Sequence, residues 1–371
     1  MNLSELQTPA LLLDAERTRR NARRVAERAG AWGVSLRPHV KTHKCAEVAR
    51  IQTEGASGAI TVATLGEARW FAARGFRDIT YAVPVEPGKF AAACRLAGEG
   101  VRLALVTDDV DVPVALDGTA RDAGVTLDLF LKVDCGYHRC GVEPHHPWAM
   151  EIPRRISGAK NLRFAGILTH AGHSYRCRTR AELEEVARQE RDVMVEFAGR
   201  LRGEGIEVPI VSVGSTPTVS VAEDMRGVDE IRPGNYIFYD AFQATLGSCA
   251  FEDCALTVLS AVVHRTGRKV VIDAGAIALS KDRGAFELDE SCGFGRVLDL
   301  EGNDLGVRVG SVSQEHGMIE VADDATAERL HVGTRVRVLA NHSCLTAAQH
   351  PHYNVLEGDR VVDRWEIQSG W

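Results

Sequence analysis

The stretch LDLFLKVD at residues 127–134 gives the most direct prediction of the fold. It is a near-continuous apolar run of strand length, the pattern of a strand buried on both faces in a parallel sheet. Similar runs alternate with helical stretches, and eight such strands predict a (β/α)8 barrel of the TIM type. A doubly wound sheet is the structural alternative, but no GxGxxG follows an early strand. The other runs lie at 36–41, 59–64, 78–84, 102–108, 164–170, 209–215 and 230–236.

Two helices of this barrel carry clear sequence signals. One covers residues 64–74 and is opened by a capping box of Thr64 and Glu67. The other, at 180–202, is the longest amphipathic stretch of the chain. After about residue 245 the pattern changes to β-rich runs with short turns. We therefore predict an α/β protein in which a barrel is followed by a mainly antiparallel β domain. The predicted bounds are 15–245 for the barrel and 246–371, together with 1–14, for the β domain.

The composition excludes several classes of function. The chain has 44 Lys and Arg against 51 Asp and Glu, a net charge of −7 with both signs interspersed. A nucleic-acid surface would need a basic patch, so no nucleic-acid partner is expected. Neither a signal peptide nor a run of ~18 apolar residues is present, so we expect a cytoplasmic protein without a membrane partner. Nine cysteines, an odd number, argue against a disulfide framework.

The ends of the predicted strands collect the residues that could carry chemistry, because barrel enzymes build their active sites there. Lys41, within RPHVKTHK at 37–44, lies where a lysine could form a Schiff base with a cofactor aldehyde, although a solvated lysine is the simpler reading. The turns SVGSTPT (212–218) and RPGNY (232–236) follow the last two strands, where barrel enzymes often bind phosphate. Each turn alone is more simply a tight turn. Together, opposite Lys41, they suggest pyridoxal 5′-phosphate.

Five motifs resemble those of the D-serine dehydratase and D-threonine aldolase family, and the similarity extends from about residue 8 to Trp371. Enzymes of this family use pyridoxal phosphate and have the alanine-racemase fold, a barrel followed by a β domain. The resemblance implies that fold and also a homodimer with active sites at its interface. The motifs are HVKTHK (39–44), VDCGYHRCGV (133–142), THAGHSY (169–175), SVGSTPT (212–218) and NHSC (341–344).

The resemblance also implies roles for single residues. Lys41 matches the Schiff-base lysine, Arg139 an arginine near the phenolic oxygen of the cofactor, and Tyr175 a tyrosine beside the pyridine ring. His170 and Tyr236, at the ends of two predicted strands, are added to the predicted cofactor site. The predicted phosphate site consists of Gly214, Ser215, Thr216, Gly234 and Asn235.

Lys132 alternates with Leu131 and Val133, so it should point into the barrel, where an unpaired ammonium is costly. The favoured interpretation is a structural charge that supports the site. In related racemases, a lysine at this place is carbamylated.

The NHSC motif suggests a metal site. His342 and Cys344 are two residues apart on a predicted strand, which would place both side chains on one face. An isolated H-x-C is usually chance, but here it matches the metal motif of the family. A thiolate and an imidazole favour Zn²⁺, with Mn²⁺ or Mg²⁺ as the alternatives.

These residues predict a lyase that acts on a small D-3-hydroxy amino acid such as D-serine or D-threo-3-hydroxyaspartate. Lys41 would take the Cα proton and the metal would assist departure of the β-hydroxyl, which gives a 2-oxo acid and ammonia. Aldolase members have a carboxylate at the position of Cys344, so dehydration is favoured. The alternatives are a D-threonine or 3-hydroxy-D-aspartate aldolase, which would form glycine and an aldehyde or glyoxylate, and a non-catalytic pyridoxal-phosphate carrier. The β domain that carries NHSC argues against the carrier.

Overall fold

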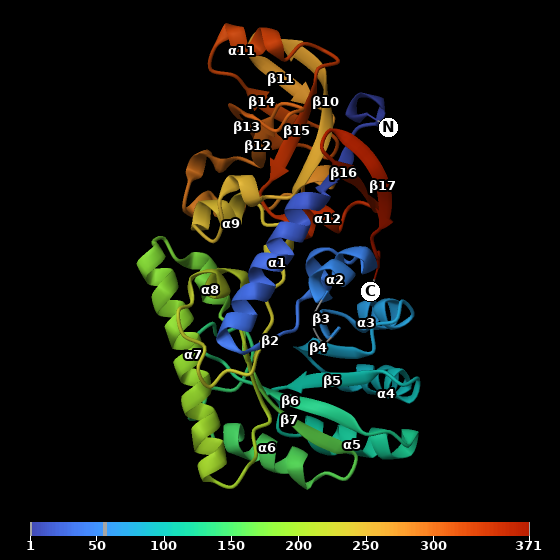
Figure 1. Cartoon of the computed structure of the whole chain (residues 1–371), viewed down its shortest axis with the longest axis vertical. Coiled ribbons are helices and arrows are strands. Elements are labelled where there is room, and N and C mark those ends of the chain that lie inside the picture. The colour runs from blue at the N-terminus through green and yellow to red at the C-terminus, as the bar shows by residue number, and fades with distance from the viewer. Residues whose placement is uncertain (1, 55–57, 371) are drawn as a thin grey trace. The chain divides into compact units, whose positions relative to one another are not determined.

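The structure is a computed structural model that describes residues 2–54 and 58–370. Within them, an eight-stranded parallel sheet confirms the predicted barrel (Figure 1). Its strands follow the order β2-β9-β8-β7-β6-β5-β4-β3, and a single parallel bridge between His39 and Thr61 joins the two ends of this order. The strands are β2 (Ser35–Leu36), β3 (Ile60–Val62), β4 (Asp78–Pro84), β5 (Arg102–Thr107), β6 (Leu127–Lys132), β7 (Leu162–Leu168), β8 (Ile210–Val213) and β9 (Glu230–Ile231).

The first and last strands are shorter than the sequence predicted. Lys41 lies in the 3-10 helix η2 (Val40–Thr42) and not on a strand. Residues beyond β9 form the 3-10 helix η5 (Asn235–Ile237). Both strands stop before a proline, Pro38 or Pro233, which has no backbone N–H to continue a ladder.

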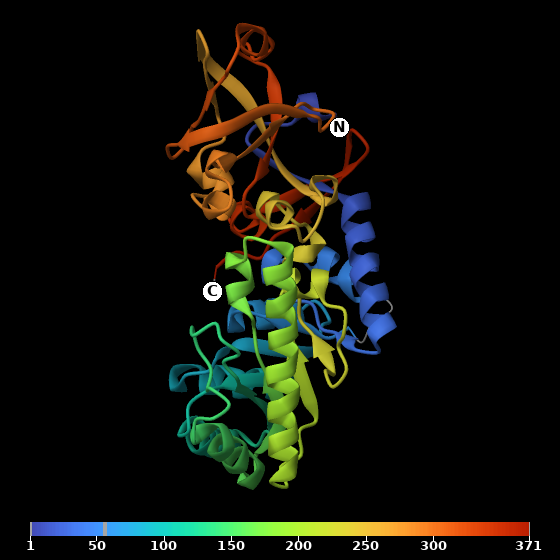
Figure 2. The same ribbon diagram turned by 90° about the vertical axis from the view of Figure 1, so that its left-hand side faces the viewer.

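Helices α3 to α7 lie outside these strands (Figure 1), and α7 extends along them as the long green helix of Figure 2. Thr179 caps α7 by accepting the N–H of Glu182, so the helix begins where the sequence predicted. Thr64 caps α3 in the same way. The helices are α1 (Ala15–Trp32), α2 (Ala46–Thr53), α3 (Leu65–Ala72), α4 (Phe90–Gly98), α5 (Val112–Ala123), α6 (Trp148–Gly158), α7 (Arg180–Gly203) and α8 (Thr216–Val221).

The second sheet has nine strands in the order β11-β14-β13-β12-β15-β10-β1-β16-β17. Its pairs are antiparallel except β1 with β16, which confirms a mainly antiparallel β domain. The strands are β1 (Ala10–Asp14), β10 (Leu256–Thr266), β11 (Lys269–Ile272), β12 (Gly295–Leu298), β13 (Asp304–Val312), β14 (Gly317–Glu320), β15 (Arg335–Ala340), β16 (His352–Glu357) and β17 (Arg360–Glu366). Short helices accompany them, namely α9 (Ala241–Leu246), α10 (Ala276–Leu279), α11 (Asp324–Arg329) and α12 (Ser343–Ala347).

By their internal contacts the residues form two compact units. The barrel unit contains Arg24–Lys41 and Gln52–Gly234. The β unit contains Thr42–Ile51, Asn235–Ser369 and the N-terminal residues up to Arg23. The β unit has its own core, in which Phe238 and Tyr353 are fully buried. No helix in the described part of the chain has the length and apolar character needed to cross a membrane.

Candidate active site

A cluster of cationic side chains surrounds His170 in the barrel unit, just beyond the end of β7. Burial lowers the pKa of His170 well below its usual value, and the charges of Lys41, Lys132, Arg139 and Arg232 lower it further. The imidazole is therefore neutral near pH 7. The structure thus brings together three residues that the sequence assigned to one site, Lys41, Arg139 and His170. Tyr175 joins them, with its ring centre 6.4 Å from that of His170.

Lys132 is the last residue of β6, and only 4% of its surface is exposed. No carboxylate among the described residues lies within ion-pair distance of its ammonium group. Burial is the main reason why the pKa of Lys132 is lowered to about 8, and the charge of Arg232 acts in the same direction. A buried ammonium beside other cations is costly unless an anion binds nearby. The donor set therefore fits an anionic cofactor such as pyridoxal phosphate.

The loop that carries Arg139 is held by its own side chains. The Asp134 carboxylate accepts the N–H groups of Gly136 and His138, which folds the turn after β6. The guanidinium of Arg139 lies 5.0 Å from the ring centre of Tyr137. Gly172 allows this arrangement, because a Cβ there would lie 2.2 Å from the Tyr137 ring. The glycine of THAGHSY is thus required for packing.

The first predicted phosphate turn follows β8. Gly214 has a φ of +100°, a conformation that favours glycine. Ser215 caps α8 by accepting the N–H of Thr218, and its hydroxyl lies 3.2 Å from that of Ser174. Thr216 is buried. The turn is therefore connected to the loop that carries Tyr175.

Glu190, on α7, is a buried residue of this region that sequence reasoning missed. Its carboxylate accepts the N–H of Ala171 at 3.0 Å and that of Gly214 at 3.1 Å. It also accepts the hydroxyl of Thr218 at 2.8 Å. One carboxylate thus connects the loops after β7 and β8. Its partners lie 19 to 28 residues away in the chain, and no local pattern marks it.

The second predicted phosphate turn follows β9. The carbonyl of Pro233 accepts the N–H of His39, and Gly234 is buried. Arg232 is buried as well, and its guanidinium donates to Ser212 and to the carbonyl of Thr169. Desolvation lowers the pKa of Arg232 to about 10.

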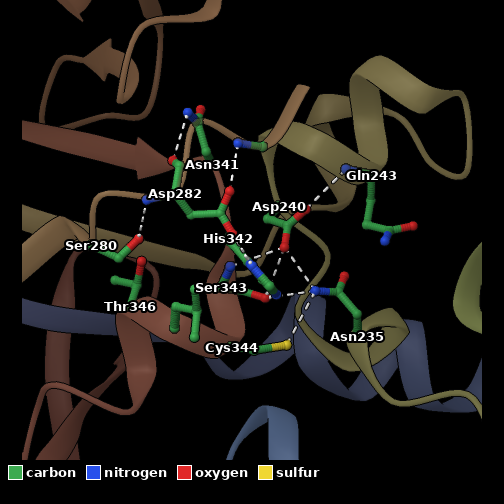
Figure 3. A network of polar contacts seen from close by, with 12 residues as sticks. Asn235, Asp240, Gln243, Ser280, Asp282, Asn341, His342, Ser343, Cys344 and Thr346 are labelled. Atoms are coloured by element: carbon green, nitrogen blue, oxygen red, sulfur yellow. Dashed lines mark hydrogen bonds and ion pairs between the residues drawn. The ribbon is translucent and has the colours of Figure 1, made fainter. Parts of the chain in front are cut away.

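Asn235 and Tyr236, the next two residues, belong by their contacts to the β unit. Tyr236 is buried in η5. The side-chain amide of Asn235 donates to Asp240 at 2.7 Å, to Ser343 at 3.0 Å and to the sulfur of Cys344 at 3.6 Å. The structure thus brings this predicted phosphate residue to the NHSC motif (Figure 3).

His342 and Cys344 do not lie on a strand, so this part of the sequence prediction was wrong. Strand β15 ends at Ala340, His342 is the N-cap of α12, and Cys344 lies in that helix. The physical reason is a tertiary contact, because the Asp240 carboxylate accepts the N–H of Ser343 at 2.9 Å and turns the chain there. The two side chains nevertheless lie near enough for each to shift the pKa of the other.

The imidazole and the thiol shift each other's proton equilibria. Burial alone would raise the pKa of Cys344, but the charge of His342 lowers it below its usual value. Burial would lower the pKa of His342, yet Cys344 and the carboxylate of Asp282 raise it well above its usual value. Thiolate and imidazole are donors that bind zinc. This donor chemistry fits a divalent metal ion.

Asp240 and Asp282 lie on either side of this pair (Figure 3). One carboxylate oxygen of Asp240 accepts from Asn235 and from both the N–H and the hydroxyl of Ser343. Through these hydrogen bonds, Asp240 holds the backbone of the NHSC motif in place. Within the described residues, no group of three or more His, Cys, Asp or Glu side chains is arranged so that it could hold a metal ion. The pair would therefore leave open positions on a bound ion.

Comparisons with known proteins identify the family. The profile of the alanine racemase N-terminal domain matches residues 13–241, and that of the putative serine dehydratase domain matches residues 255–356. The chain therefore belongs to the alanine-racemase-like family that includes the D-serine dehydratases and the D-threonine aldolases.

Three relatives show how close this similarity is. The chain is 40% identical to D-threo-3-hydroxyaspartate dehydratase from Delftia sp. (strain HT23), over 100% of this chain and 99% of that protein. The structure of that enzyme has a TM-score of 0.96, and each chain is fully covered. D-serine dehydratase from Dictyostelium discoideum is 34% identical, over 100% and 98% of the two chains. The structure of D-threonine aldolase from Filomicrobium marinum is 28% identical with a TM-score of 0.86, over 99% and 96%.

Proposed function

We propose that this chain is a lyase that depends on pyridoxal phosphate and zinc and removes water from a D-3-hydroxy amino acid, giving a 2-oxo acid and ammonia. The observation that carries the proposal is the placement of His342 and Cys344 together at the start of α12, where each shifts the pKa of the other. A thiolate and an imidazole favour zinc, whereas the aldolases of the family, as the resemblance implies, have a carboxylate at the position of Cys344. The relatives named as dehydratases support this choice, and one solved variant of the Delftia enzyme, a cysteine-to-alanine mutant, is described as metal-free.

The residues predicted for the cofactor site would bind the cofactor and move the proton. Bound pyridoxal phosphate would supply an electron sink that makes the Cα–H of the substrate acidic. Lys41 would hold the cofactor and then accept the Cα proton. Arg139, His170 and Tyr175 would contact the cofactor ring. The phosphate would lie at the two turns after β8 and β9, namely at Gly214, Ser215, Thr216, Gly234 and Asn235. Tyr236 would complete the cofactor site.

The residues of the β unit would assist the leaving group. Hydroxide is a poor leaving group, because water is a very weak acid. A zinc ion held by His342 and Cys344 would supply Lewis acidity at the β-hydroxyl. Asp240 would keep the NHSC segment in place, since it accepts three hydrogen bonds from Asn235 and Ser343.

Product analysis tests the proposal. The purified protein, supplied with pyridoxal phosphate and Zn²⁺, is incubated with D-serine, D-threo-3-hydroxyaspartate and D-threonine, and with the L-enantiomers as controls. We expect a 2-oxo acid and equimolar ammonia from at least one D-substrate, and loss of this activity after chelation. Glycine and an aldehyde would instead support the alternative, an aldolase, which the D-threonine aldolase relative favours. No product from any substrate would contradict both.

A further inference from the structure

Asp282 makes a short contact with the imidazole of His342 and lies 60 residues away from it in the chain. One carboxylate oxygen lies 2.6 Å from Nδ1 of His342, and the other accepts the N–H of Gly284 at 2.6 Å. Figure 3 shows the carboxylate beside the imidazole, between the loop after α10 and the start of α12. Because both oxygens have a donor, the plane of the carboxylate is fixed.

The backbone of Asp282 is held as firmly as its side chain. Its N–H donates to the hydroxyl of Ser280 at 3.2 Å, and its carbonyl accepts from the amide of Asn341 at 3.3 Å. The same amide donates to the carbonyl of Gly293 at 2.8 Å. Since Asn341 directly precedes His342, the loop of Asp282 is anchored to the residue next to the imidazole. The distance between carboxylate and ring is therefore set by a network and not by one flexible side chain.

A carboxylate at Nδ1 decides which ring nitrogen carries the proton. An ionised carboxylate can only accept hydrogen bonds, so Nδ1 of His342 must carry its proton. The lone pair of a neutral imidazole is then on Nε2. Histidines that bind metals usually have such a partner on the other nitrogen, which fixes the tautomer and the ring orientation.

We propose that Asp282 is a positioning residue for the metal ion. It holds His342 with Nδ1 protonated and Nε2 available to a divalent cation, beside the thiol of Cys344. This inference rests on the proposed function, because it assumes that His342 and Cys344 bind zinc. It adds a residue that is not a ligand itself and that raises the affinity of the pair for the ion.

A second histidine–carboxylate pair shows that a contact between a carboxylate and an imidazole does not by itself make a metal site. In the barrel unit, Nδ1 of His138 lies 3.0 Å from the carboxylate of Asp134. His138 is 69% exposed, and no thiol in the described part of the chain forms a hydrogen bond with its ring. His342 is only 32% exposed and has Cys344 as a neighbour. The Asp282 pair thus has the second donor that a metal site requires.

Metal titration of the Asp282→Asn variant tests the proposal. Wild-type protein and variant, both with pyridoxal phosphate bound, are freed of metal by chelation and titrated with Zn²⁺ in competition with a chromophoric chelator. We expect the variant to bind one Zn²⁺ per chain about 10- to 100-fold more weakly. With Co²⁺ as the probe, the thiolate charge-transfer absorption should persist, because Cys344 is retained, while the ligand-field bands shift. Asp282→Glu, which keeps the acceptor, should recover part of the affinity.

Asp289→Asn is the matched control. Asp289 lies in the same segment and caps Ser291, so this variant makes the same change of charge without touching His342. Its Zn²⁺ affinity should stay within about twofold of wild type. Urea unfolding of all variants distinguishes a role in metal binding from a purely structural role of Asp282. A purely structural role would lower the urea midpoint of Asp282→Asn and leave the Zn²⁺ affinity of its folded protein unchanged.

The outcomes distinguish the inference from the function on which it rests. If wild-type protein binds no Zn²⁺, the metal part of the proposed function fails, and the role of Asp282 fails with it. If wild-type protein binds Zn²⁺ and folded Asp282→Asn binds it equally tightly, the inference alone is overturned. The same holds if Asp282→Asn unfolds and folded Asp282→Ser, which also lacks the carboxylate, binds Zn²⁺ as tightly as wild type with an unchanged Co²⁺ spectrum.

Discussion

The two ends of the barrel strands use charged side chains in opposite ways. At the amino ends, cations and anions alternate in direct contact. Arg37 contacts Glu230 at 2.5 Å and Asp78 at 2.6 Å. The chain of ion pairs continues from Asp78 through Arg102 and Asp128 to Arg163.

At the carboxyl ends, cations gather around a neutral His170. Neither Lys132 nor Arg139 has a carboxylate within ion-pair distance in the described part of the chain. Such a surplus of positive charge lowers the stability of the protein when no ligand is bound. One end of the barrel thus stabilises the fold, and the other is suited to bind an anion.

The largest effect is expected for Lys41→Ala, which should lower turnover by about 10⁴-fold or more, because both the cofactor attachment and the proton acceptor disappear. Lys41 is exposed, so the free energy of unfolding should change by less than about 1 kcal/mol. Steady-state kinetics and urea unfolding measure the two quantities.

Borohydride reduction of the wild-type protein should leave the cofactor on the peptide that contains Lys41. A label on Lys44 or Lys132 would contradict the assignment. Lys44→Gln, which changes the neighbouring lysine of the same motif, should keep its turnover and serves as the control.

Arg37→Met, at the amino ends of the strands, should lower the stability of the protein and leave its turnover unchanged. The side chain of Glu230 is only 4% exposed, so loss of Arg37 would leave a buried carboxylate without its cation. Breaking a buried pair in this way destabilises by about 3–5 kcal/mol. The chemistry should be unchanged in protein that remains folded.

The control for Arg37 is Arg121→Met. Arg121 and Asp122 form an ion pair whose side chains are 68% and 71% exposed. Surface pairs contribute about 0–1 kcal/mol. Equal losses of stability in Arg37→Met and Arg121→Met would contradict the structural role proposed for the ion pairs at the amino ends.

Lys132→Met should stabilise the cofactor-free protein at pH 7, because it removes a buried ammonium that has no carboxylate within ion-pair distance among the residues that the structure describes. The pKa of Lys132 is lowered from 10.5 to about 8, mainly by burial. Between these values the unfolded chain keeps a proton that the folded protein has released, so the free energy of unfolding rises with pH. This group alone would contribute about 3 kcal/mol across the window.

Urea unfolding of the cofactor-free protein at pH 7 and pH 10 checks the sign. The difference between Lys132→Met and wild type should be largest at pH 7 and should shrink towards pH 10, since other titrating groups cancel in the comparison. A variant that is less stable than wild type at pH 7 would show that Lys132 has a stabilising partner.

The sequence predicted the barrel well, because each buried strand is marked by a local apolar run. Strand β6 and helix α7 were placed within a few residues, and the cap at Thr179 fixes the start of α7. The ends of β2 and β9 were missed because Pro38 and Pro233 limit the ladder there.

The candidate site was only partly predictable. The NHSC motif revealed His342 and Cys344, but their helical setting depends on Asp240, which is about 100 residues away. Asp282 and Glu190 act through tertiary contacts and belong to no motif. Buried carboxylates of this kind can be found only once the fold brings their partners to them.

The smallest effect is expected for Glu190→Gln. This variant tests whether the carboxylate of Glu190 holds the loops after β7 and β8 in place. The glutamine oxygen can still accept the N–H groups of Ala171 and Gly214. Its amide would face the hydroxyl of Thr218, which can turn and donate to the carbonyl of Ser215, 3.3 Å away. About one hydrogen bond to a charged group would be weakened, and a loss near 1 kcal/mol corresponds to an about fivefold lower cofactor affinity. Fluorescence titration with pyridoxal phosphate measures that affinity.

Glu190→Leu, which leaves both N–H groups without an acceptor, should lose far more cofactor affinity. Equal cofactor affinities in Glu190→Leu and wild type would mean that these loops keep their shape without the carboxylate.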